Sequence, residues 1–181
     1  MVKRNYPPGQ KRKKRRAATL SEYGKELREK QKLRNWYNLE ERQLRIYVKK
    51  ILKKRGKTED PAVLLIKDLE SRLENVVFRL GFTQSRAQAK QLVSHSHFLV
   101  NGRPVNIPSY QMKKGDVITP APRKIKKTVF QKLKPLLKKY KTPSWLTLDP
   151  EKLEGKVVGK PTLEEAAPPV EISAIFEFYP R

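Results

Sequence analysis

The chain contains two histidines, His95 and His97, which lie two residues apart and are the side chains best suited to metal binding or catalysis. Zinc takes three or four ligands, and the chain has no cysteine and no carboxylate cluster beside this pair. Acid–base or nucleophilic catalysis would need an oriented partner, yet the nearest downstream acid, Asp116, falls in an expected turn. We therefore expect no metal site, no catalytic residue and no bound cofactor.

Contact with a polyanion is the chemistry that the neighbouring polar residues favour. Arginine can pair with a phosphate through two hydrogen bonds, histidine can stack on a base, and glutamine can read a base edge. In the first turn of an expected helix, Arg86 opposes the helix dipole, and a residue that breaks a local rule is a candidate for function. The candidates are Arg86, Gln88, Lys90, Ser94, His95, His97 and Arg103. Two plainer interpretations stay open: a solvated helix face, and histidines that bond the last helix carbonyls.

The overall charge also predicts a polyanionic partner. The chain has 42 Lys and Arg against 18 Asp and Glu, a formal net charge of +24, and nucleic acid is the first candidate. A membrane would require a long apolar run or a strongly amphipathic basic helix, and we expect neither. Residues 1–20 read as a basic arm, for which a solubilising tail is the alternative. Its block of like charges is Lys11, Arg12, Lys13, Lys14, Arg15 and Arg16.

Local signals predict the elements that position these residues. Ser85 and Gln88 form a capping box that starts a helix, with Ala89, Leu92 and Val93 on its buried edge and Arg86 and Lys90 on a polar face. The pair Asn101-Gly102 favours a type I′ hairpin turn, and Lys114-Gly115-Asp116 repeats this logic before Val117. The middle of the chain is therefore expected to hold two helices followed by a small antiparallel sheet, an α+β fold.

The flanking segments are expected to be mainly helical. Ser21 can cap a first helix, Asn38-Leu-Glu-Glu41 resembles a capping box, and Asp60-Pro61 is a further start signal. Residues 69–80 carry an apolar stripe that ends at Gly81. Residues 143–155 look irregular and lead to a short strand at 156–158. The apolar tail, residues 172–179, fits a short helix that packs back on the N-terminal part. The start of the chain lacks an apolar secretory segment, so we expect a cytoplasmic protein.

Several motifs together resemble one known family. Residues 72–118, "RLENVVFRLGFTQSRAQAKQLVSHSHFLVNGRPVNIPSYQMKKGDVI", resemble the RNA-binding module of the bacterial small-subunit ribosomal protein S-four family. The segments "YPPGQ" (6–10), "LSEYGKELREKQKLR" (20–34), "PSWLTLDPEKLEG" (143–155) and "FEFYPR" (176–181) are similar to the flanks of the same family. The resemblance therefore covers nearly all of the chain.

The resemblance implies a structural ribosomal protein that binds small-subunit ribosomal RNA at a multi-helix junction and nucleates assembly. It implies neighbours among the small-subunit proteins, including ribosomal protein S-five, whose interface is linked with decoding accuracy; some relatives also bind messenger RNA. It adds Asn101 to the RNA-facing residues given above. It divides the chain into the arm (1–20), a helical domain (21–67, completed by 160–181) and an inserted RNA-binding module (68–159).

The chain also departs from the family pattern. It resembles a short form without the N-terminal cysteine segment that holds zinc in many relatives, and the basic block stands where relatives commonly have His-Gly. We expect this block to supply phosphate contacts. A bacterial or an organellar ribosome stays open. The rival functions are an RNA-modifying enzyme, for which too few residues follow Ile118, and a stress-response RNA binder, which the ribosome-like flanks disfavour.

Overall fold

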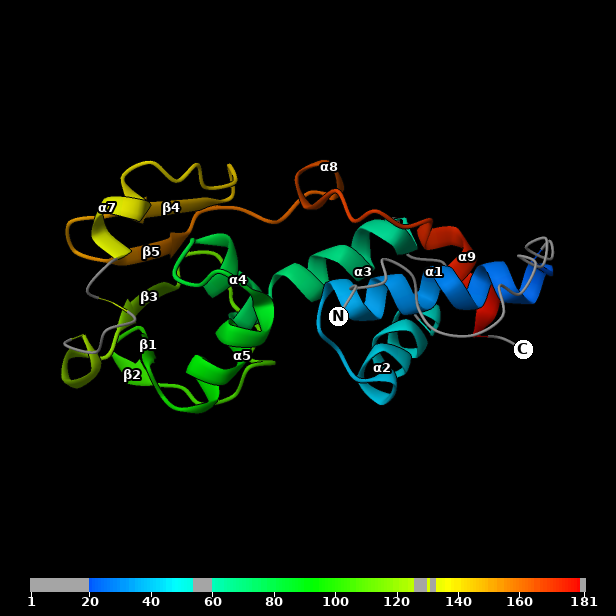
Figure 1. Ribbon diagram of the computed structural model, residues 1–181, viewed down its shortest axis with the longest axis horizontal. Helices are drawn as coiled ribbons and strands as arrows, with labels where there is room; N and C mark the ends of the chain where they lie inside the picture. The colour runs from blue at the N-terminus through cyan, green and yellow to red at the C-terminus, as the bar shows by residue number, and fades with distance from the viewer. Residues whose placement is uncertain (1–19, 54–59, 126–129, 131–132, 180–181) are drawn as a thin grey trace, which may run out of the picture.

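The computed structural model describes residues 20–53, 60–125, 130 and 133–179. Figure 1 shows two lobes, one made of helices and the other of a sheet with helices against it. The two lobes have separate apolar cores, one from residues 33–69 and 163–179 and the other from residues 73–157. The α+β class expected from the sequence is confirmed. None of the helices in these described stretches is long and apolar enough to cross a membrane.

The helical lobe combines N-terminal and C-terminal elements. It contains α1 (Glu22–Trp36), α2 (Glu41–Leu52), α3 (Pro61–Glu70), α8 (Leu163–Ala166) and α9 (Ile172–Phe178). Ser21 and Asp60 cap α1 and α3 by accepting from backbone amides, as predicted. The tail helix α9 packs against α1 and places Ile175 in the core beside Leu33, so the prediction that the tail folds back is confirmed.

The other lobe is a small sheet with helices packed on it. It contains α4 (Leu73–Arg79), α5 (Arg86–Ser94), a 3₁₀ turn (Pro122–Lys124) and α7 (Leu133–Leu137). The strands are β1 (Phe98–Val100), β2 (Arg103–Pro104), β3 (Val117–Pro120), β4 (Leu146–Asp149) and β5 (Glu154–Val157), all paired antiparallel in the order β2-β1-β3-β5-β4. The predicted succession of two helices and an antiparallel sheet is confirmed.

Three local expectations are wrong. Asn38 was expected to cap α2, but the N-cap is Glu40, whose side chain makes no capping hydrogen bond. Asn38 has a positive φ of 51° and belongs to the preceding turn. The stretch 143–155 contains β4, which Leu146 and Leu148 build by pairing with β5. The stripe over residues 69–80 crosses a break, because α3 ends at Glu70 and α4 begins at Leu73.

A buried arginine holds the break between α3 and α4. Arg72 is almost fully buried, and its Nε donates to Glu74 Oε1 at 2.7 Å while its Nη1 donates to the Tyr47 hydroxyl at 2.8 Å. Gln111 donates to the same hydroxyl and to the carbonyl of Asp68. These bonds tie α2, α3, α4 and the loop before β3 together, so the geometry of the break is set by polar contacts on both lobes.

Candidate nucleic-acid interface

Helix α5 begins as the sequence predicts, with one difference. Ser85 Oγ accepts from the amide of Gln88 at 3.2 Å, which confirms the N-cap. The Gln88 side chain accepts from the amide of Gln84 at 3.0 Å instead of that of residue 85. The capping box is therefore displaced by one residue, because Gln84 presents its amide toward the helix. The apolar edge of α5 is buried as expected and fixes which side chains remain outside.

The outer side of α5 carries part of the predicted interface. Gln88 and Lys90 are half-buried, and Ser94 and His95 are exposed. Ser94 Oγ donates to the carbonyl of Lys90 at 2.9 Å, and the amide of His95 donates to the carbonyl of Gln91 at 3.0 Å. These bonds close the helix and leave the His95 ring on the surface, where it can stack on a base or donate to a phosphate.

The hairpin between β1 and β2 carries the second part. Asn101 and Gly102 have φ values of 51° and 77°, both positive as a type I′ turn requires, and Val100 pairs with Arg103. Asn101 donates to Asp116 Oδ1 and accepts from the amide of Val117, each at 2.9 Å. Its side chain therefore joins the two turns that the sequence predicts, and Arg103 beside it is exposed.

The surviving candidates lie on α5, at its C-terminal end and on the hairpin after β1. We call this set the α5–hairpin strip: Gln88, Lys90, Ser94, His95, Asn101 and Arg103. Ser94 and His95 lie before the start of β1, whereas Asn101 and Arg103 follow its end. At about 3.3 Å per residue, the three-residue strand between the two groups is about 10 Å long. The strip suits several contacts along a nucleic-acid backbone better than one enclosed ligand.

His97 does not share the surface with His95. It is 4% exposed, and its ring centroid lies 6.2 Å from that of Phe130 in the core of the sheet lobe. Its backbone carbonyl accepts from the amide of Ala121 at 2.8 Å. The expectation that both histidines present donors on one surface is wrong, because Ser96 has a positive φ of 53° and turns the chain at the end of α5, where the amide of His97 donates back to the carbonyl of Leu92. Within the described stretches, no group of three metal-binding side chains occurs.

Arg86 is also inside the protein, and the expectation that it shares a polar face with Lys90 is wrong. Its side chain is 9% exposed, and its Nε donates to Asn75 Oδ1 at 3.2 Å. Burial lowers the pKa of its guanidinium. The guanidinium lies within 4.5–5.1 Å of three ring centroids, those of Trp36, Tyr37 and Phe78. Arg86 therefore lies in the first turn of α5, against the preference of the helix dipole, because its guanidinium contacts aromatic rings of the other lobe.

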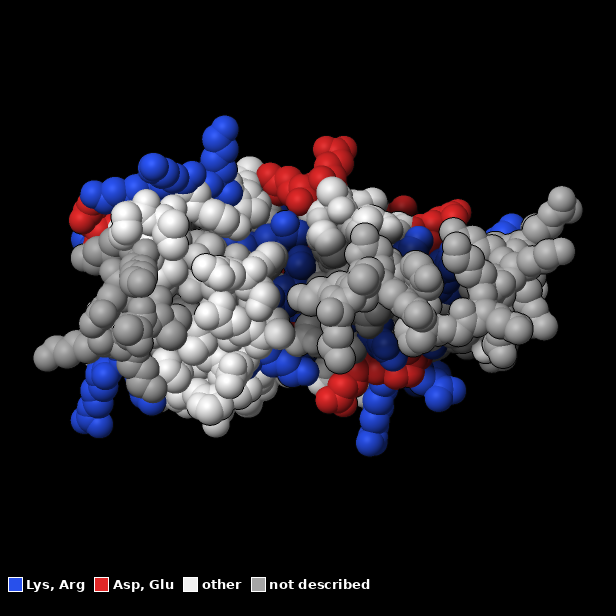
Figure 2. Space-filling view, in the orientation of Figure 1, with Lys and Arg blue, Asp and Glu red and all other residues white. Residues whose placement is uncertain are grey.

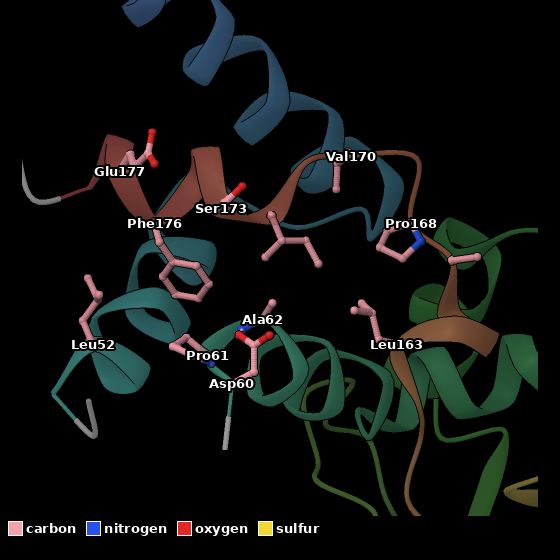
Figure 3. Close-up of a pocket in the computed structure, with 12 residues that line it drawn as sticks. Leu52, Asp60, Pro61, Ala62, Leu163, Pro168, Val170, Ser173, Phe176 and Glu177 are labelled. Atoms are coloured by element: carbon pink, nitrogen blue, oxygen red, sulfur yellow. The ribbon is translucent and has the colours of Figure 1, made fainter. Parts of the chain in front are cut away.

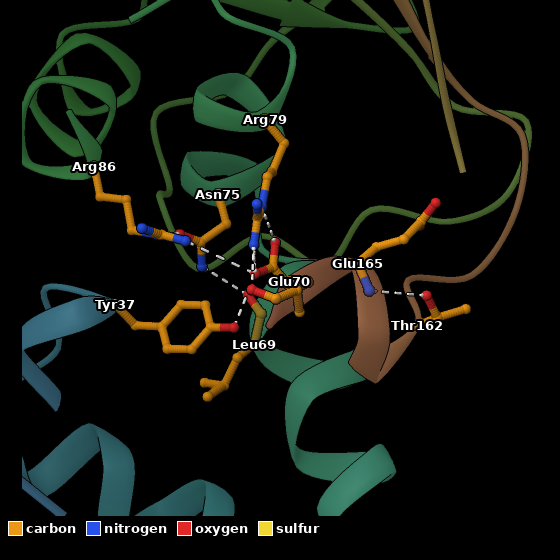
Figure 4. Close-up of polar contacts among 9 residues, drawn as sticks. Tyr37, Leu69, Glu70, Asn75, Arg79, Arg86, Thr162 and Glu165 are labelled. Atoms are coloured by element: carbon orange, nitrogen blue, oxygen red, sulfur yellow. Dashed lines mark hydrogen bonds and ion pairs between the residues drawn. The ribbon is translucent and has the colours of Figure 1, made fainter. Parts of the chain in front are cut away.

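Arg86 belongs to a set of buried polar residues that we call the Glu70 cluster: Tyr37, Glu70, Asn75, Arg79 and Arg86 (Figure 4). Glu70 accepts from the Tyr37 hydroxyl at 2.8 Å and from Arg79 Nε and Nη2 at 2.9 and 2.7 Å, while Arg86 Nη2 lies 3.8 Å from Glu70 Oε1. Arg79 Nη2 also donates to the carbonyl of Ala166 at 3.1 Å. The cluster joins α1, α3, α4, α5 and α8. Sequence reasoning missed it, because its members are far apart along the chain.

Replacement of Tyr37 by Phe tests one bond of this cluster. Burial, together with the Glu70 carboxylate, raises the pKa of Tyr37 above its ordinary value of 10.0. The protonated phenol therefore stabilises the folded state fully below pH 10, and this stability is lost as the pH rises above 10 toward the folded-state pKa. We expect Tyr37→Phe to lower the free energy of unfolding at pH 7 by about 1.5–3 kcal/mol and to reduce its further fall above pH 10.

Urea unfolding at pH 7 and between pH 9 and 11 measures both effects. Tyr110→Phe, at an exposed tyrosine, is the control and should change neither quantity. Tyr179, whose pKa is also raised by burial, contributes to the alkaline loss in every variant. An unchanged stability at pH 7 in Tyr37→Phe would show that the bond to Glu70 contributes nothing.

The charged surface is unevenly distributed. In Figure 2, Lys and Arg gather over α7 and β4 and along the boundary between the lobes, whereas acidic side chains gather near α8.

A hollow of about 720 Å³ lies between the end of α2, the start of α3 and α9 (Figure 3). It is lined mainly by apolar residues, with Asp60 and Glu177 among them. Two carboxylates oppose a phosphate, so this hollow is unsuited to nucleic acid. The basic block Lys11–Arg16 lies outside the described residues.

Comparisons with known proteins identify the family of the chain. The family model described as the S4 domain matches residues 71–118, and the model of the ribosomal protein S4/S9 N-terminal domain matches residues 1–67. The chain is 45% identical to the small ribosomal subunit protein uS4 of Roseiflexus sp. (strain RS-1), over 100% of this chain and 87% of that protein. It is 46% identical to the uS4 of Caldicellulosiruptor bescii (99% and 84%) and 44% identical to that of Chloroflexus aurantiacus (99% and 86%). The chain therefore belongs to the uS4 family, the structural and non-catalytic proteins of the small ribosomal subunit.

Proposed function

We propose that the protein binds small-subunit ribosomal RNA through the α5–hairpin strip and the basic arm, and that it nucleates subunit assembly at a multi-helix junction of that RNA. The observation that carries the proposal is the exposed and half-buried polar strip on the S4 domain of a chain with net charge +24. Histidine, glutamine and arginine side chains suit phosphates, riboses and unpaired bases. The protein works without a catalytic step, in the cytoplasm, as a fixed component of the small subunit.

The same proposal extends to protein partners and to the domain division. We expect the helical lobe to contact ribosomal protein S-five and thereby influence decoding accuracy, which the family resemblance supports; messenger RNA stays a further candidate partner. We also propose that residues 68–159 form an inserted module between the two halves of the helical domain. The two separate apolar cores support this division.

Removal of the two strongest donors of the strip tests RNA binding. We expect His95→Ala combined with Arg103→Ala to weaken binding to a small-subunit ribosomal RNA fragment about tenfold. The slope of log affinity against log salt should fall by about 1, because one phosphate contact is lost. Fluorescence anisotropy over a salt series measures both.

Arg28→Ala combined with Gln31→Ala removes a cation and a polar group from an exposed part of α1 and serves as the matched control. The control should keep at least half of the affinity. If the strip variant and the control bind equally well, the strip is not the RNA-binding surface. If the unmodified chain does not bind the fragment, the whole proposal fails.

A further inference from the structure

A second, smaller hollow lies where the sheet lobe meets α3. It measures about 260 Å³ and is lined by Lys67 at the end of α3, Lys113 and Lys114 before β3, and Lys160 after β5. No acidic residue lines it within the part of the chain that the structure describes. We call it the lysine hollow. Four lysines from three separate segments therefore line one small volume.

Backbone pairing fixes the rim of the lysine hollow. The amide of Gly115 donates to the carbonyl of Val157 at 2.8 Å, and the amide of Val157 donates back to the carbonyl of Asp116 at 3.0 Å. The amides of Val158 and Gly159 both donate to the carbonyl of Trp145, at 2.9 and 3.1 Å. These four backbone donors are already engaged, so the lysine ammonium groups are the cationic donors that the lining offers a ligand.

Two carboxylates close in sequence to these lysines have other partners. Asp116 accepts from the Asn101 side chain at 2.9 Å and from the backbone amide of Lys113 at 2.7 Å. Asp68 pairs with Lys50 at 2.9 Å. Among the described residues, Lys113, Lys114 and Lys160 form no ion pair, and all three are exposed. Like charges around a concave surface repel one another and concentrate a positive potential, which an anion relieves.

The inner wall of the hollow is apolar. Met112, Trp145 and Val157 line it, and each belongs to the core of the sheet lobe with less than a tenth of its surface exposed. Sites for larger organic ligands usually exceed about 300 Å³, so this hollow suits one planar ring system. An apolar wall beside a cationic rim matches a nucleotide, which joins an aromatic base to a phosphate.

We propose that the lysine hollow binds one unpaired nucleotide of RNA, with its base against Met112, Trp145 and Val157 and its flanking phosphates on Lys113, Lys114 and Lys160. This inference rests on the proposed function, because it adds a second contact for the same RNA. The position supports it: Asn101 is bonded to Asp116, so the hairpin end of the α5–hairpin strip and the turn that carries Lys113 and Lys114 lie at the same end of the sheet.

The charge of the rim is tested with the full-length chain and the same ribosomal RNA fragment. We expect Lys113→Ala, Lys114→Ala and Lys160→Ala together to weaken binding about tenfold or more at physiological salt, with a salt slope lower by about 2, because one nucleotide has two flanking phosphates. The matched control removes three other exposed lysines, Lys139, Lys141 and Lys152. A smaller loss in the control supports the proposal, and an equal loss in both variants overturns it.

The base is tested through Trp145, since the chain has two tryptophans. In a Trp36→Phe background, we expect the RNA fragment to quench the Trp145 fluorescence and saturating inorganic phosphate to leave it unchanged. Equal quenching by phosphate would mean an anion site without a base and would overturn the proposal.

The comparison of the two variants separates this inference from the proposed function. If the unmodified chain binds the fragment, and the strip variant has a lower affinity while the hollow variant does not, this inference fails and the proposed function stands. Thermal unfolding of the triple variant should match the unmodified chain, because the three side chains are exposed.

Discussion

Replacement of Glu70 by Gln is expected to lower the free energy of unfolding by about 3–5 kcal/mol, the cost of leaving buried cations without their anion. Glu70 is 1% exposed and is the acceptor for Tyr37 and Arg79, with Arg86 at 3.8 Å. The amide of glutamine keeps the shape but removes the negative charge. Because the cluster then holds two arginines and no carboxylate, their mutual repulsion acts in a dry environment.

Urea unfolding measures this change, and Glu164→Gln is the matched control. Glu164 is exposed in α8, so its replacement should shift the stability by less than about 0.5 kcal/mol. A double-mutant cycle with Arg79→Met separates the pair from other effects, because the second replacement removes one of the stranded cations. A Glu70→Gln loss no larger than that of the control would show that the cluster contributes nothing to stability.

Replacement of Gly155 by Ala should lower the stability by about 1–3 kcal/mol, the usual cost of overpacking a core. Gly155 is buried in β5 and pairs with Ile118 and Leu148. A Cβ atom there would overlap Leu80 Cδ1 and come within 2.9 Å of Leu80 Cδ2. Leu80 is fully buried in the core of the sheet lobe, so it cannot move aside without displacing its neighbours.

Gly159→Ala provides the control, since a Cβ atom at that position would meet Trp145 at an ordinary distance of 3.5 Å. The two substitutions add the same methyl group, and guanidinium unfolding should separate them. In a Leu80→Ala background, the cost of Gly155→Ala should fall by at least about 0.5 kcal/mol, because the overlapping atoms are gone. Equal costs in both backgrounds would rule out Leu80 as the cause.

Three helix caps and one hairpin turn were read correctly from signals that act within four residues, whereas the cap expected at Asn38 was wrong. The caps at Ser21, Asp60 and Ser85 are confirmed, because each depends on one side chain and an amide two or three residues further on. The hairpin at Asn101-Gly102 is confirmed for a similar reason, since it depends on the backbone preferences of two adjacent residues. The family resemblance came from the same short motifs. These local signals were enough to predict the fold class and the place of α5.

Features that depend on distant residues were not predictable. Arg86 looked like a surface cation because its partners, Tyr37 and Glu70, belong to the other lobe. No sequence pattern around Tyr37 or Glu70 indicates a contact with Arg86. His97 looked exposed beside His95, although the left-handed backbone of Ser96 turns the chain so that His97 packs in the core against Phe130. Lys113 and Lys114 were read only as part of a turn. Antiparallel pairing of β3 with β5 is the signal that could have placed them near Lys160.

The division of the helical lobe sets the order in which the protein can fold during synthesis. Its core joins Leu33 and Leu44 to Ile172 and Ile175, and the whole sheet lobe lies between them in the chain. A ribosome releases the sheet lobe complete while the helical lobe still lacks its last helix. Nascent chains usually fold from the N-terminus onward, domain by domain. Here the middle of the chain finishes first, and the N-terminal helices keep an exposed apolar face until residues 163–179 have been synthesised.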